Sequence, residues 1–555
     1  MVLPDFITKL LDERGVITDN DKTAFLSPDF LQGTHGAFLL ADIRAAALRV
    51  VEACERKEKI AIYADFDADG IPGAVILHDF FTKIGVQPIV YIPHRHNEGY
   101  GLHPAAIEKL HEQGVTLLIT VDVGISGHEG ARRAQALGID LLITDHHELP
   151  AELPAAYAIV HPRLISEETK AQYPFVHLCG AAVAFKLVQA TLAVGREQKI
   201  STYLAVPEGW EKWLLDMVGI ATLSDMVPLK GENRVLASFG LMVLRKSPRK
   251  GLKALCKKNR IDQRSLTEED IGFTITPRIN AASRMDEPEL AFRLLATQDM
   301  EEAELLAATL EKLNTKRKGA VASVVKIARA KVLERHPDDF VAVVGDPSWK
   351  PALLGLAANS LLDGRKGVVC LWGRDGTGML KGSCRSDGSV HVTEMFAAAG
   401  VALEESGGHA CAGGFSVSLD EVHTLHTHFS RVARTVPAAP ATVSVPHAIH
   451  PRELTYALYE SLRILAPFGV GNEKPQLELP DVLIEEVRIF GKEGNHTEII
   501  VSKDGYRIRA FQFFKTPDDF TKLPTVGETC TLRGSVERDQ FKGIRKVALR
   551  TVDVR

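Results

Sequence analysis

The feature of the sequence that most limits its fold is a series of short apolar runs that alternate with amphipathic segments. The runs are IAIYA at 60–64, QPIVYI at 87–92, TLLITV at 116–121 and DLLIT at 140–144. Segments of helical period, such as GAVILHDFFTKIG at 73–85, lie between them. Strand, helix, strand at this spacing predicts the α/β class, with a mainly parallel sheet covered by helices on both faces.

Acidic or imidazole clusters directly follow three of these runs. Residues 65–70 (DFDADG) follow the first run, Asp122 follows TLLITV, and residues 145–147 (DHH) follow DLLIT. Ligands of parallel sheets bind at the carboxyl ends of the strands, so we expect these clusters to converge. A fourth candidate, Asp225 in GIATLSDMVPL, follows an apolar segment whose place in the fold the pattern does not give.

A DxDxDG run also resembles a calcium-binding loop, but such a loop needs Glu at its twelfth position, where Ile76 stands. A phosphatase with an aspartyl nucleophile would leave the other clusters unexplained, so we rank it below a metal site. Carboxylates combined with imidazole suit Mn²⁺ or Mg²⁺, and imidazole favours manganese. Two ions roughly 3.5–4 Å apart would generate hydroxide and stabilise the attacking and leaving oxygens on phosphorus. The clusters therefore predict phosphoester hydrolysis.

Downstream, residues 300–335 contain no proline and place apolar residues at helical spacing. They predict one helix about 50 Å long, with Gly319 as its weak point. Two apolar runs and a glycine-rich tract at 407–416 predict a second α/β domain, and residues 435–451 have the composition of a linker. The regularly spaced strand-type runs beyond it predict a small β-barrel of the oligonucleotide-binding type.

In YRIRAFQFF at 506–514, alternation puts Arg507, Arg509, Phe511 and Phe513 on one side of a strand. Cations beside aromatic rings suit a surface that binds single-stranded nucleic acid. The alternative, with equal weight, is that the phenylalanines lie in the core and the arginines are merely exposed.

A chain of 555 residues exceeds what one core supports and should form several domains. Its net charge of −5 leaves nucleic-acid binding to local basic patches, and the eight lysines and arginines at 245–260 are typical of a solvated surface. Seven scattered cysteines without a CxxC pair predict reduced thiols. No signal-type or membrane-spanning apolar stretch is evident, which favours a cytoplasmic protein.

The order DFDADG, VDVGIS, TDHH and LSDMVPL resembles the four motifs of the DHH phosphoesterase superfamily. ITPRINAASRM, LKGSCRS, GGHACAGGFS and LAPFGVGN narrow the resemblance to its RecJ branch, from about residue 45 to the last residue given. The resemblance implies an N-terminal segment (1–44), a DHH catalytic domain (45–299), a connecting helix (300–335), a DHH-associated domain (336–434), a linker (435–451) and an OB-like barrel (452–555).

The same resemblance implies roles for single residues. The implied metal ligands are Asp65, Asp67, Asp69, Asp122, His146 and Asp225. Asp122 would bridge two ions and act in catalysis with His146 and His147, and His147 would face the scissile phosphate. Arg278, Asn280 and Arg284 would contact phosphates or brace the site, while Arg95, Ser383 and Arg385 would form a pocket for the 5′ end. His409 would be contributed to the cleft by the second domain.

The resemblance implies a 5′→3′ exonuclease specific for single-stranded DNA, acting in DNA repair and recombination and releasing 5′-mononucleotides with two Mn²⁺ or Mg²⁺ ions. A single-strand-binding protein and a helicase are candidate partners, and no membrane is involved. The alternatives are a DHH oligoribonuclease or cyclic-dinucleotide phosphodiesterase, and a nonenzymatic replication or repair scaffold. Lys350 and Ala352 depart from the family pattern, where His and Gly are usual.

Overall fold

The computed structural model describes residues 4–401, 403–439, 446–491, 494–539 and 547–555, and the chain divides into two compact units. The larger unit is Phe30–Ala441, and the smaller one joins Met1–Asp29 to Thr442–Arg555. Part of the predicted linker, residues 440–445, lies outside the described residues. Among the helices described, none is long and apolar enough to cross a membrane.

The first sheet of the larger unit has five strands in the order β2-β1-β3-β4-β5, all parallel. Its strands are β1 (Lys59–Ala64), β2 (Ile89–Tyr91), β3 (Val115–Val121), β4 (Asp140–Thr144) and β5 (Ala158–Val160). The apolar runs at 60–64, 87–92, 116–121 and 140–144 form the first four strands, and the predicted parallel sheet is confirmed.

Helices cover both faces of this sheet. Successive side chains of a strand point to opposite sides, so each strand contributes to a core on either face. In β1, Ile60 and Ile62 pack into the core formed with α4 (Ile43–Glu55), α5 (Gly70–Lys83) and α8 (Gly180–Glu197). Ala61 and Tyr63 pack into the opposite core, formed with α6 (Pro104–Glu112) and α7 (His128–Ala136). A strand buried on both faces reads as an unbroken apolar run, which is why these strands are visible in the sequence.

The remainder of this α/β region is helical. Its further segments are α3 (Phe30–Gly33), η1 (Ala37–Leu39), α9 (Ser201–Leu204), η2 (Trp210–Leu214), α10 (Leu215–Ser224), α11 (Gly231–Leu244), α12 (Lys250–Asn259), η3 (Gln263–Ser265), α13 (Glu268–Asp270), the π-helix η4 (Ile271–Ile275), α14 (Thr276–Arg284) and α15 (Glu289–Ala296).

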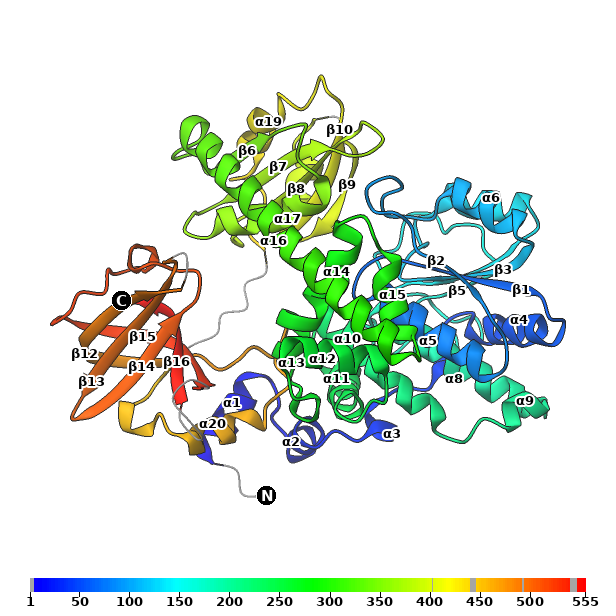
Figure 1. The fold of residues 1–555 in the computed structure, drawn as a ribbon, viewed down its shortest axis with the longest axis horizontal. Coiled ribbons are helices and arrows are strands. Elements are labelled where there is room, and N and C mark those ends of the chain that lie inside the picture. Colours follow the sequence, from blue (N-terminus) through cyan, green and yellow to red (C-terminus); the bar gives the residue numbers. More distant parts are fainter. Residues whose placement is uncertain (1–3, 402, 440–445, 492–493, 540–546) are drawn as a thin grey trace. The chain divides into compact units, whose positions relative to one another are not determined.

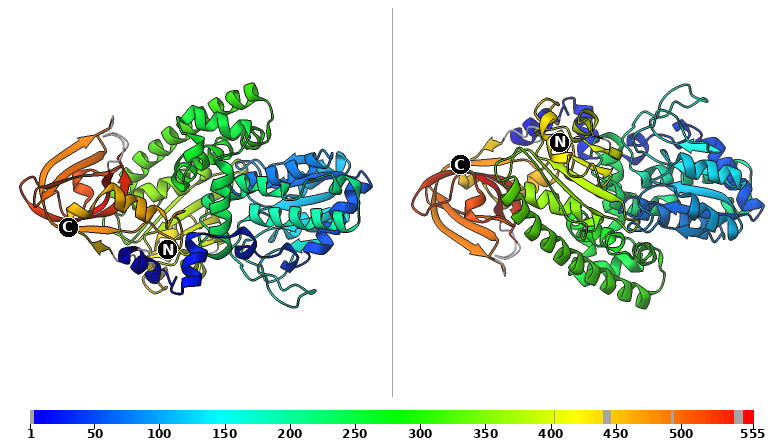
Figure 2. Two further views of the ribbon diagram at one scale, coloured as in Figure 1. Left: turned by 90° about the horizontal axis from the view of Figure 1, so that it is seen from below. Right: turned by 90° about the horizontal axis from the view of Figure 1, so that it is seen from above.

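The predicted long helix is confirmed as α16 (Met300–Arg335), which at 36 residues is about 54 Å long. Figures 1 and 2 show it running from the helical region to the second sheet. Its first half buries Leu306 and Leu310 in the first core, and its second half buries Ala328 and Val332 in the core of the second sheet. A side chain added at Gly319 would meet nothing within 4 Å. The helix is therefore one continuous element shared by two cores.

The second sheet has the order β6-β7-β8-β10-β9, parallel only between β6 and β7. Its elements are β6 (Val341–Gly345), α17 (Pro351–Leu362), β7 (Val368–Arg374), β8 (Leu380–Ser386), α18 (Val392–Ala398), β9 (Leu403–His409), β10 (Ala412–Val417) and α19 (Leu425–Val432). The predicted second α/β domain is confirmed.

Two cysteines of this sheet correct the prediction of reduced thiols. Cys370 on β7 and Cys384 on β8 are joined by a disulfide, with Cα atoms 4.2 Å apart. They stand directly opposite each other in the antiparallel register of the two strands. The pairing of β7 with β8 brings these two cysteines together, and their spacing in the sequence, which is not that of a CxxC pair, does not predict it.

The smaller unit contains a closed five-stranded barrel in the order β12-β13-β14-β16-β15, with β12 paired back to β15, so the predicted OB-like barrel is confirmed. Its elements are β11 (His447–Ala448), η5 (Pro451–Glu453), α20 (Tyr456–Arg463), β12 (Leu477–Phe490), β13 (His496–Lys503), β14 (Tyr506–Gln512), η6 (Pro517–Asp519), β15 (Thr529–Arg538) and β16 (Val547–Val554).

Two helices from the other end of the chain, α1 (Asp5–Glu13) and α2 (Asp19–Leu26), belong to this smaller unit. Ile7, Leu10 and Leu11 of α1 are at most 1% exposed and lie in the same core as the barrel strands. Arg14 donates to the side-chain oxygen of Asn472 over 2.9 Å. Residues 1–44, predicted as a separate N-terminal segment, are therefore divided: α1 completes the core of the barrel, whereas residues from Phe30 onward belong to the larger unit.

Candidate metal centre and substrate cleft

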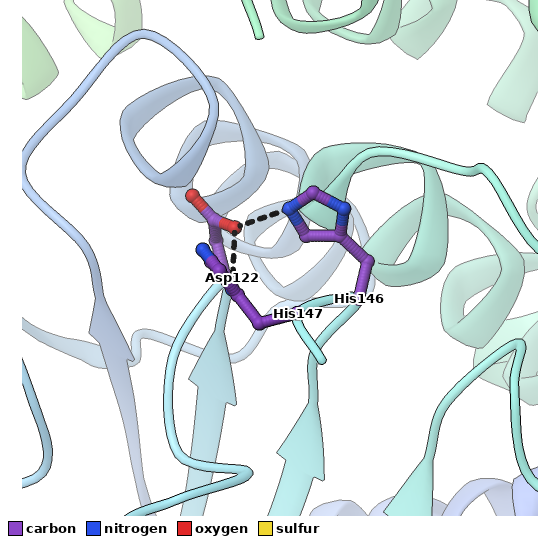
Figure 3. A group of neighbouring side chains, drawn as sticks. All are labelled: Asp122, His146 and His147. Atoms are coloured by element: carbon purple, nitrogen blue, oxygen red, sulfur yellow. Dashed lines mark ion pairs between the residues drawn. The ribbon is translucent and has the colours of Figure 1, made fainter. Parts of the chain in front are cut away.

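The candidate centre lies at the carboxyl ends of β1, β3 and β4, where the polar clusters of the sequence meet. Figure 3 shows Asp122, after β3, with His146 and His147, after β4, turned toward one another. Oδ1 of Asp122 lies 3.2 Å from Nε2 of His146 and 3.8 Å from Nδ1 of His147. The convergence expected from the strand-end rule is therefore present.

Two further carboxylates approach the same imidazole. Nε2 of His146 lies 3.7 Å from Oδ2 of Asp69 and 3.6 Å from Oδ2 of Asp225. Asp225 caps the carboxyl end of α10, and this helix packs on α5 and α8, which cover the sheet. Helix packing thus brings in the one candidate whose position the sequence pattern does not give.

The possible ligand atoms fall into three overlapping groups, each with all atoms within 4.8 Å of one another. One group is Asp65, Asp67 and Asp122, a second is Asp69, His146 and Asp225, and a third is Asp122, His146 and His147. Asp122 belongs to two of these groups, and His146 links it to Asp69 and Asp225. Asp122 therefore lies where the possible ligand groups overlap.

The carboxylates of this centre are buried and repel one another. Burial and the neighbouring Asp67 raise the pKa of Asp69 to about 7. Burial and the charges of neighbouring aspartates also raise the pKa values of Asp65, Asp122 and Asp225. Burial and the nearby His147 lower the pKa of His146 to about 3, which leaves a neutral imidazole that can donate a lone pair. Divalent ions would offset this repulsion.

Unsatisfied atoms point to the same conclusion. Among the described residues, Oδ1 of Asp65, Oδ1 of Asp122 and Nε2 of His146 are buried without a hydrogen-bond partner. Buried polar atoms nearly always have a partner, and an ion is one explanation for the exceptions. The residues present therefore fit a divalent metal centre.

Asp145 orients both histidines. Its Oδ1 accepts a 2.7 Å hydrogen bond from the backbone N–H of His146 and lies 2.8 Å from Nδ1 of His147, and its Oδ2 accepts from the N–H of Ile125. Although burial lowers the pKa of His147, the hydrogen bond that its ring donates to Asp145 and the charges of Asp145, Asp225 and Asp65 together outweigh burial and raise the pKa to about 9. His147 therefore carries a proton at Nδ1 that Asp145 holds.

The first turn of α8 places Asp69 and restricts the space around Asp122. The backbone N–H groups of Gly180 and Ala181 donate to the two carboxylate oxygens of Asp69, over 2.6 and 2.7 Å. A Cβ at Gly180 would lie 2.5 Å from Cβ of Asp122. Asp122 itself has φ of +61°, in the left-handed region where Asp and Asn are the tolerated side chains. The backbone here is arranged to aim these two carboxylates.

Arg284 lies close enough to Arg95, Arg317 and Arg385 for their charges to act on it, and we refer to these four residues as the arginine cluster. Burial and the positive charges of the other three lower the pKa of Arg284 to about 9. The Arg95 guanidinium lies 4.5 Å from the centre of the Phe66 ring. Such mutual repulsion is relieved by a bound anion, and guanidinium groups pair well with phosphate. This arginine cluster has the chemistry of a phosphate subsite.

A cavity of about 820 Å³ lies between the two α/β regions of the larger unit. Phe66, Arg95 and Tyr100 line it from the first region, and Lys381 and Ser406 line it from the second. Arg284 donates to the backbone carbonyl of Ala352, and Nζ of Lys350 lies 2.5 Å from Oδ2 of Asp286, so the Lys350 side chain, one of the two family departures, takes part in joining the regions. The cavity adjoins the centre through Phe66, which sits between Asp65 and Asp67.

The other predicted site residues have different surroundings. Ser383 and Arg385 lie two residues apart on β8, hence on one face of the strand. Asn280 braces the DFDADG loop, because its Oδ1 accepts from the N–H of Ala68. Arg278 is ion-paired with Glu311 over 2.7 Å, and His409 is exposed at the end of β9. Arg278 thus has a structural partner rather than a free guanidinium.

Acidic side chains neutralise the two arginines of the predicted nucleic-acid-binding face of the barrel. Arg507 pairs with Glu485 and Glu486, and Arg509 pairs with Glu498 and, over 3.3 Å, with Asp539. Phe511 is 7% exposed, with its ring 5.2 Å from that of Phe513. Glu485 and Glu486 lie on β12, Glu498 lies on β13 and Asp539 follows β15, so alternation within β14 alone could not reveal these acids.

Sequence reasoning missed three contributors to the centre. The hydroxyl of Tyr100 lies 3.3 Å from both the Asp122 carbonyl oxygen and Nδ1 of His147. Arg317 lies in a lysine-rich stretch of α16 that reads as solvated surface, and it bonds to Asn314 over 2.8 Å. Gly180, in CGAAVAF, could have been suspected only as a site of close helix packing.

Family models match three stretches of the chain. The DHH family, N-terminal domain, matches residues 59–221, the DHHA1 domain matches 338–434, and the RecJ OB domain matches 447–553. Fold and site together define a DHH-type phosphoesterase.

Whole-chain relatives narrow this class. The single-stranded-DNA-specific exonuclease RecJ of Escherichia coli is 30% identical over 520 residues, covering 91% of this chain and 87% of that protein. The protein of the same name in Bacillus subtilis is 33% identical over 516 residues, 92% of this chain, but the chain spans only 63% of its length. The chain belongs to the RecJ family.

Solved structures agree with this assignment. The crystal structure of RecJ in complex with Mn²⁺ from Thermus thermophilus matches with a TM-score of 0.78 and 25% identity, over 100% of this chain and 78% of that one. A crystal structure of exonuclease RecJ bound to manganese matches with a TM-score of 0.60 and 29% identity, over 73% of this chain and 97% of that one.

Proposed function

We propose that this chain is a metal-dependent 5′→3′ exonuclease that degrades single-stranded DNA to 5′-mononucleotides. The observation that carries the proposal is the pair of ligand groups joined by Asp122, beside the arginine cluster. Relatives named single-stranded-DNA-specific exonucleases and a barrel matching the RecJ OB domain support the substrate class.

The residues of the candidate centre would have different roles in the reaction. Asp65, Asp67 and Asp122 would hold one divalent ion, and Asp69, His146 and Asp225, together with Asp122, would hold the other. Mn²⁺ or Mg²⁺ bound there would supply activation of water and stabilisation of charge on phosphorus. The protonated His147, held by Asp145, would donate a hydrogen bond to the phosphate being cleaved.

End selection rests on the arginine cluster. A terminal phosphate monoester carries more charge than an internal diester, so buried guanidinium groups would prefer it. Arg385 and Ser383 on β8 and Arg95 beside Phe66 are our candidates for this contact. The cavity between the two α/β regions would receive the adjoining nucleotides.

The cellular setting is part of the proposal. A strand must be separated before it can be degraded, so a helicase and a protein that coats single strands are the expected partners. We place the reaction in the cytoplasm, in DNA repair and recombination. We also propose a catalytic domain at 45–299, a connecting helix at 300–335, a DHH-associated domain at 336–434, a linker at 435–451 and a barrel domain from 452 onward.

The decisive assay uses DNA labelled at either end, single-stranded or duplex, with Mn²⁺, Mg²⁺ or a chelator. We expect shortening of single strands from the 5′ end, only with metal. Labelled RNA of the same sequence and a linear dinucleotide test the two alternative phosphodiesterases. Faster hydrolysis of either of these than of the DNA strand would overturn the proposed substrate.

A further inference from the structure

A second cluster of metal-ligating side chains lies in the second α/β domain, apart from the centre described above. His336 caps the carboxyl end of α16, Asp339 lies in the loop before β6, and His426 is in α19. Their possible ligand atoms all lie within 4.8 Å of one another. We refer to these three residues as the His-Asp-His cluster.

The hydrogen bonds of His336 fix which of its nitrogens is free. Its Nε2 lies 3.2 Å from the carbonyl oxygen of Val343, which can only accept, so Nε2 carries the proton of the neutral ring. The lone pair of Nδ1 is then directed at Oδ2 of Asp339, 2.8 Å away. Two acceptors at this distance need a proton or a cation between them. A ligating histidine bound to a backbone carbonyl through its other nitrogen is the usual arrangement around a metal.

His426 approaches the same carboxylate oxygen from the other side. Its Nε2 lies 3.2 Å from Oδ2 of Asp339 and, within the described part of the chain, is buried without an aligned hydrogen bond. The two imidazole rings are stacked, with centroids 4.1 Å apart.

The cluster is held in place yet open on one side. Arg365 donates to the carbonyl oxygens of Pro337 and Asp339, which fixes the loop that carries the carboxylate. His336 is 9% exposed, whereas the side chain of Asp339 is 46% exposed. Solvent can therefore supply the remaining ligands, and an ion has a path of entry.

The spacing and the donor types suit a tetrahedral ion. Two ligands at roughly 2.0–2.1 Å from Zn²⁺ and at the tetrahedral angle lie about 3.3 Å apart. The observed 2.8 and 3.2 Å need only a few tenths of an ångström of opening. Two imidazoles with one carboxylate suit zinc and similar transition metals better than magnesium.

We infer that His336, Asp339 and His426 form a transition-metal site, with Zn²⁺ as its best-fitting ion, that ties the end of the long helix α16 to α19. This inference does not depend on the proposed nuclease activity, because none of the three residues belongs to the catalytic centre or to the arginine cluster. The bound ion would fix the end of α16 against the sheet that it supports.

The test counts bound ions in the full-length protein and in matched variants. Wild type, His426→Gln and Asp339→Asn are dialysed against buffered micromolar Zn²⁺ with excess Mg²⁺, and zinc per chain is measured by mass spectrometry. Exposed His423, just before α19, provides the control variant His423→Gln. We expect one zinc ion fewer per chain in both cluster variants and no change in the control. Equal zinc content in all four proteins would overturn the inference.

The melting temperature distinguishes a metal site from a metal-free staple, in which hydrogen bonds alone join the three side chains. Zinc should raise the Tm of wild type and of His423→Gln, and this increase should shrink in His426→Gln and Asp339→Asn. A staple without metal would instead lower the Tm of both cluster variants by the same amount with and without zinc, and that result would reject the site. Circular dichroism at 20 °C identifies any variant that fails to fold, and the other cluster variant then decides.

Discussion

Oδ1 of Asp122 and Nε2 of His146 face each other across 3.2 Å, and within the described residues both are buried without a hydrogen-bond partner. The two atoms come from the ends of adjacent parallel strands, β3 and β4. Each can act as a metal ligand, and a cation shared between them would satisfy both.

Replacing Asp122 with asparagine should abolish nuclease activity and leave the fold intact. Asparagine tolerates the positive φ of this position but cannot supply the bridging charge. We expect a loss larger than ~100-fold, the upper range for changes in the shell around a metal. Because the pKa of Asp122 is raised, neutralising it should not lower the Tm in chelator. Retention of most activity in saturating Mn²⁺ would rule out the bridging role.

The stability conferred by metal should increase with pH. In the metal-free protein the pKa values of Asp65, Asp69, Asp122 and Asp225 are raised above their unfolded value, to about 7 for Asp69. Their contribution to folding stability is thus complete below about pH 4 and is lost as the pH rises through the folded pKa values. Bound cations would remove this loss. The difference in Tm between protein in Mn²⁺ and in chelator should therefore widen from pH 5 to pH 8; a constant difference would contradict the electrostatic account.

Arg385→Ala should slow degradation of 5′-phosphorylated strands more than that of 5′-hydroxyl strands. A charge-assisted hydrogen bond contributes about 1.5–3 kcal/mol, or roughly a 10- to 150-fold change in kcat/KM. Arg374→Ala is the matched control, because Arg374 is exposed at the end of the neighbouring strand β7. Equal slowing of both substrates would make Arg385 a general contact and leave polarity to other residues.

Two glycine-to-alanine changes should have opposite effects. In Gly180→Ala the new methyl would lie 2.5 Å from Cβ of Asp122, so we expect a loss of about 1–3 kcal/mol in unfolding free energy and impaired activity. In Gly319→Ala the methyl meets nothing within 4 Å, so α16 should gain about 0.5–1 kcal/mol from helix propensity. Urea unfolding of both variants measures these changes. A destabilised Gly319→Ala would mean that the middle of α16 is not regular helix in solution.

The part of the centre that the sequence predicts is the part that strands position. Asp65, Asp122 and His146 each follow an apolar run, and parallel strands bring such positions to one edge. The sequence also predicts the bounds of α16, because a proline-free stretch with apolar residues at helical spacing is a local pattern.

What the sequence could not predict depends on how elements pack. Asp225 reaches His146 only because α10 packs on α5 and α8. The disulfide between Cys370 and Cys384 follows from a strand register. Strand alternation correctly places Arg507 and Arg509 on one side, but the acids that neutralise them come from other strands. Such contacts depend on the tertiary structure and have no local sequence pattern.

The shared core of α1 and the barrel has a consequence for the order of synthesis. Ile7, Leu10 and Leu11 leave the ribosome before residues 30–441, whereas the strands that cover them come after those residues. At ~5–20 residues per second, these apolar side chains wait on the order of a minute for their partners. The larger unit can fold during that interval, but the smaller one cannot close until translation is nearly complete. A nascent chain stalled before β12 would thus carry the complete candidate metal centre and an uncovered amphipathic helix, a target for chaperones.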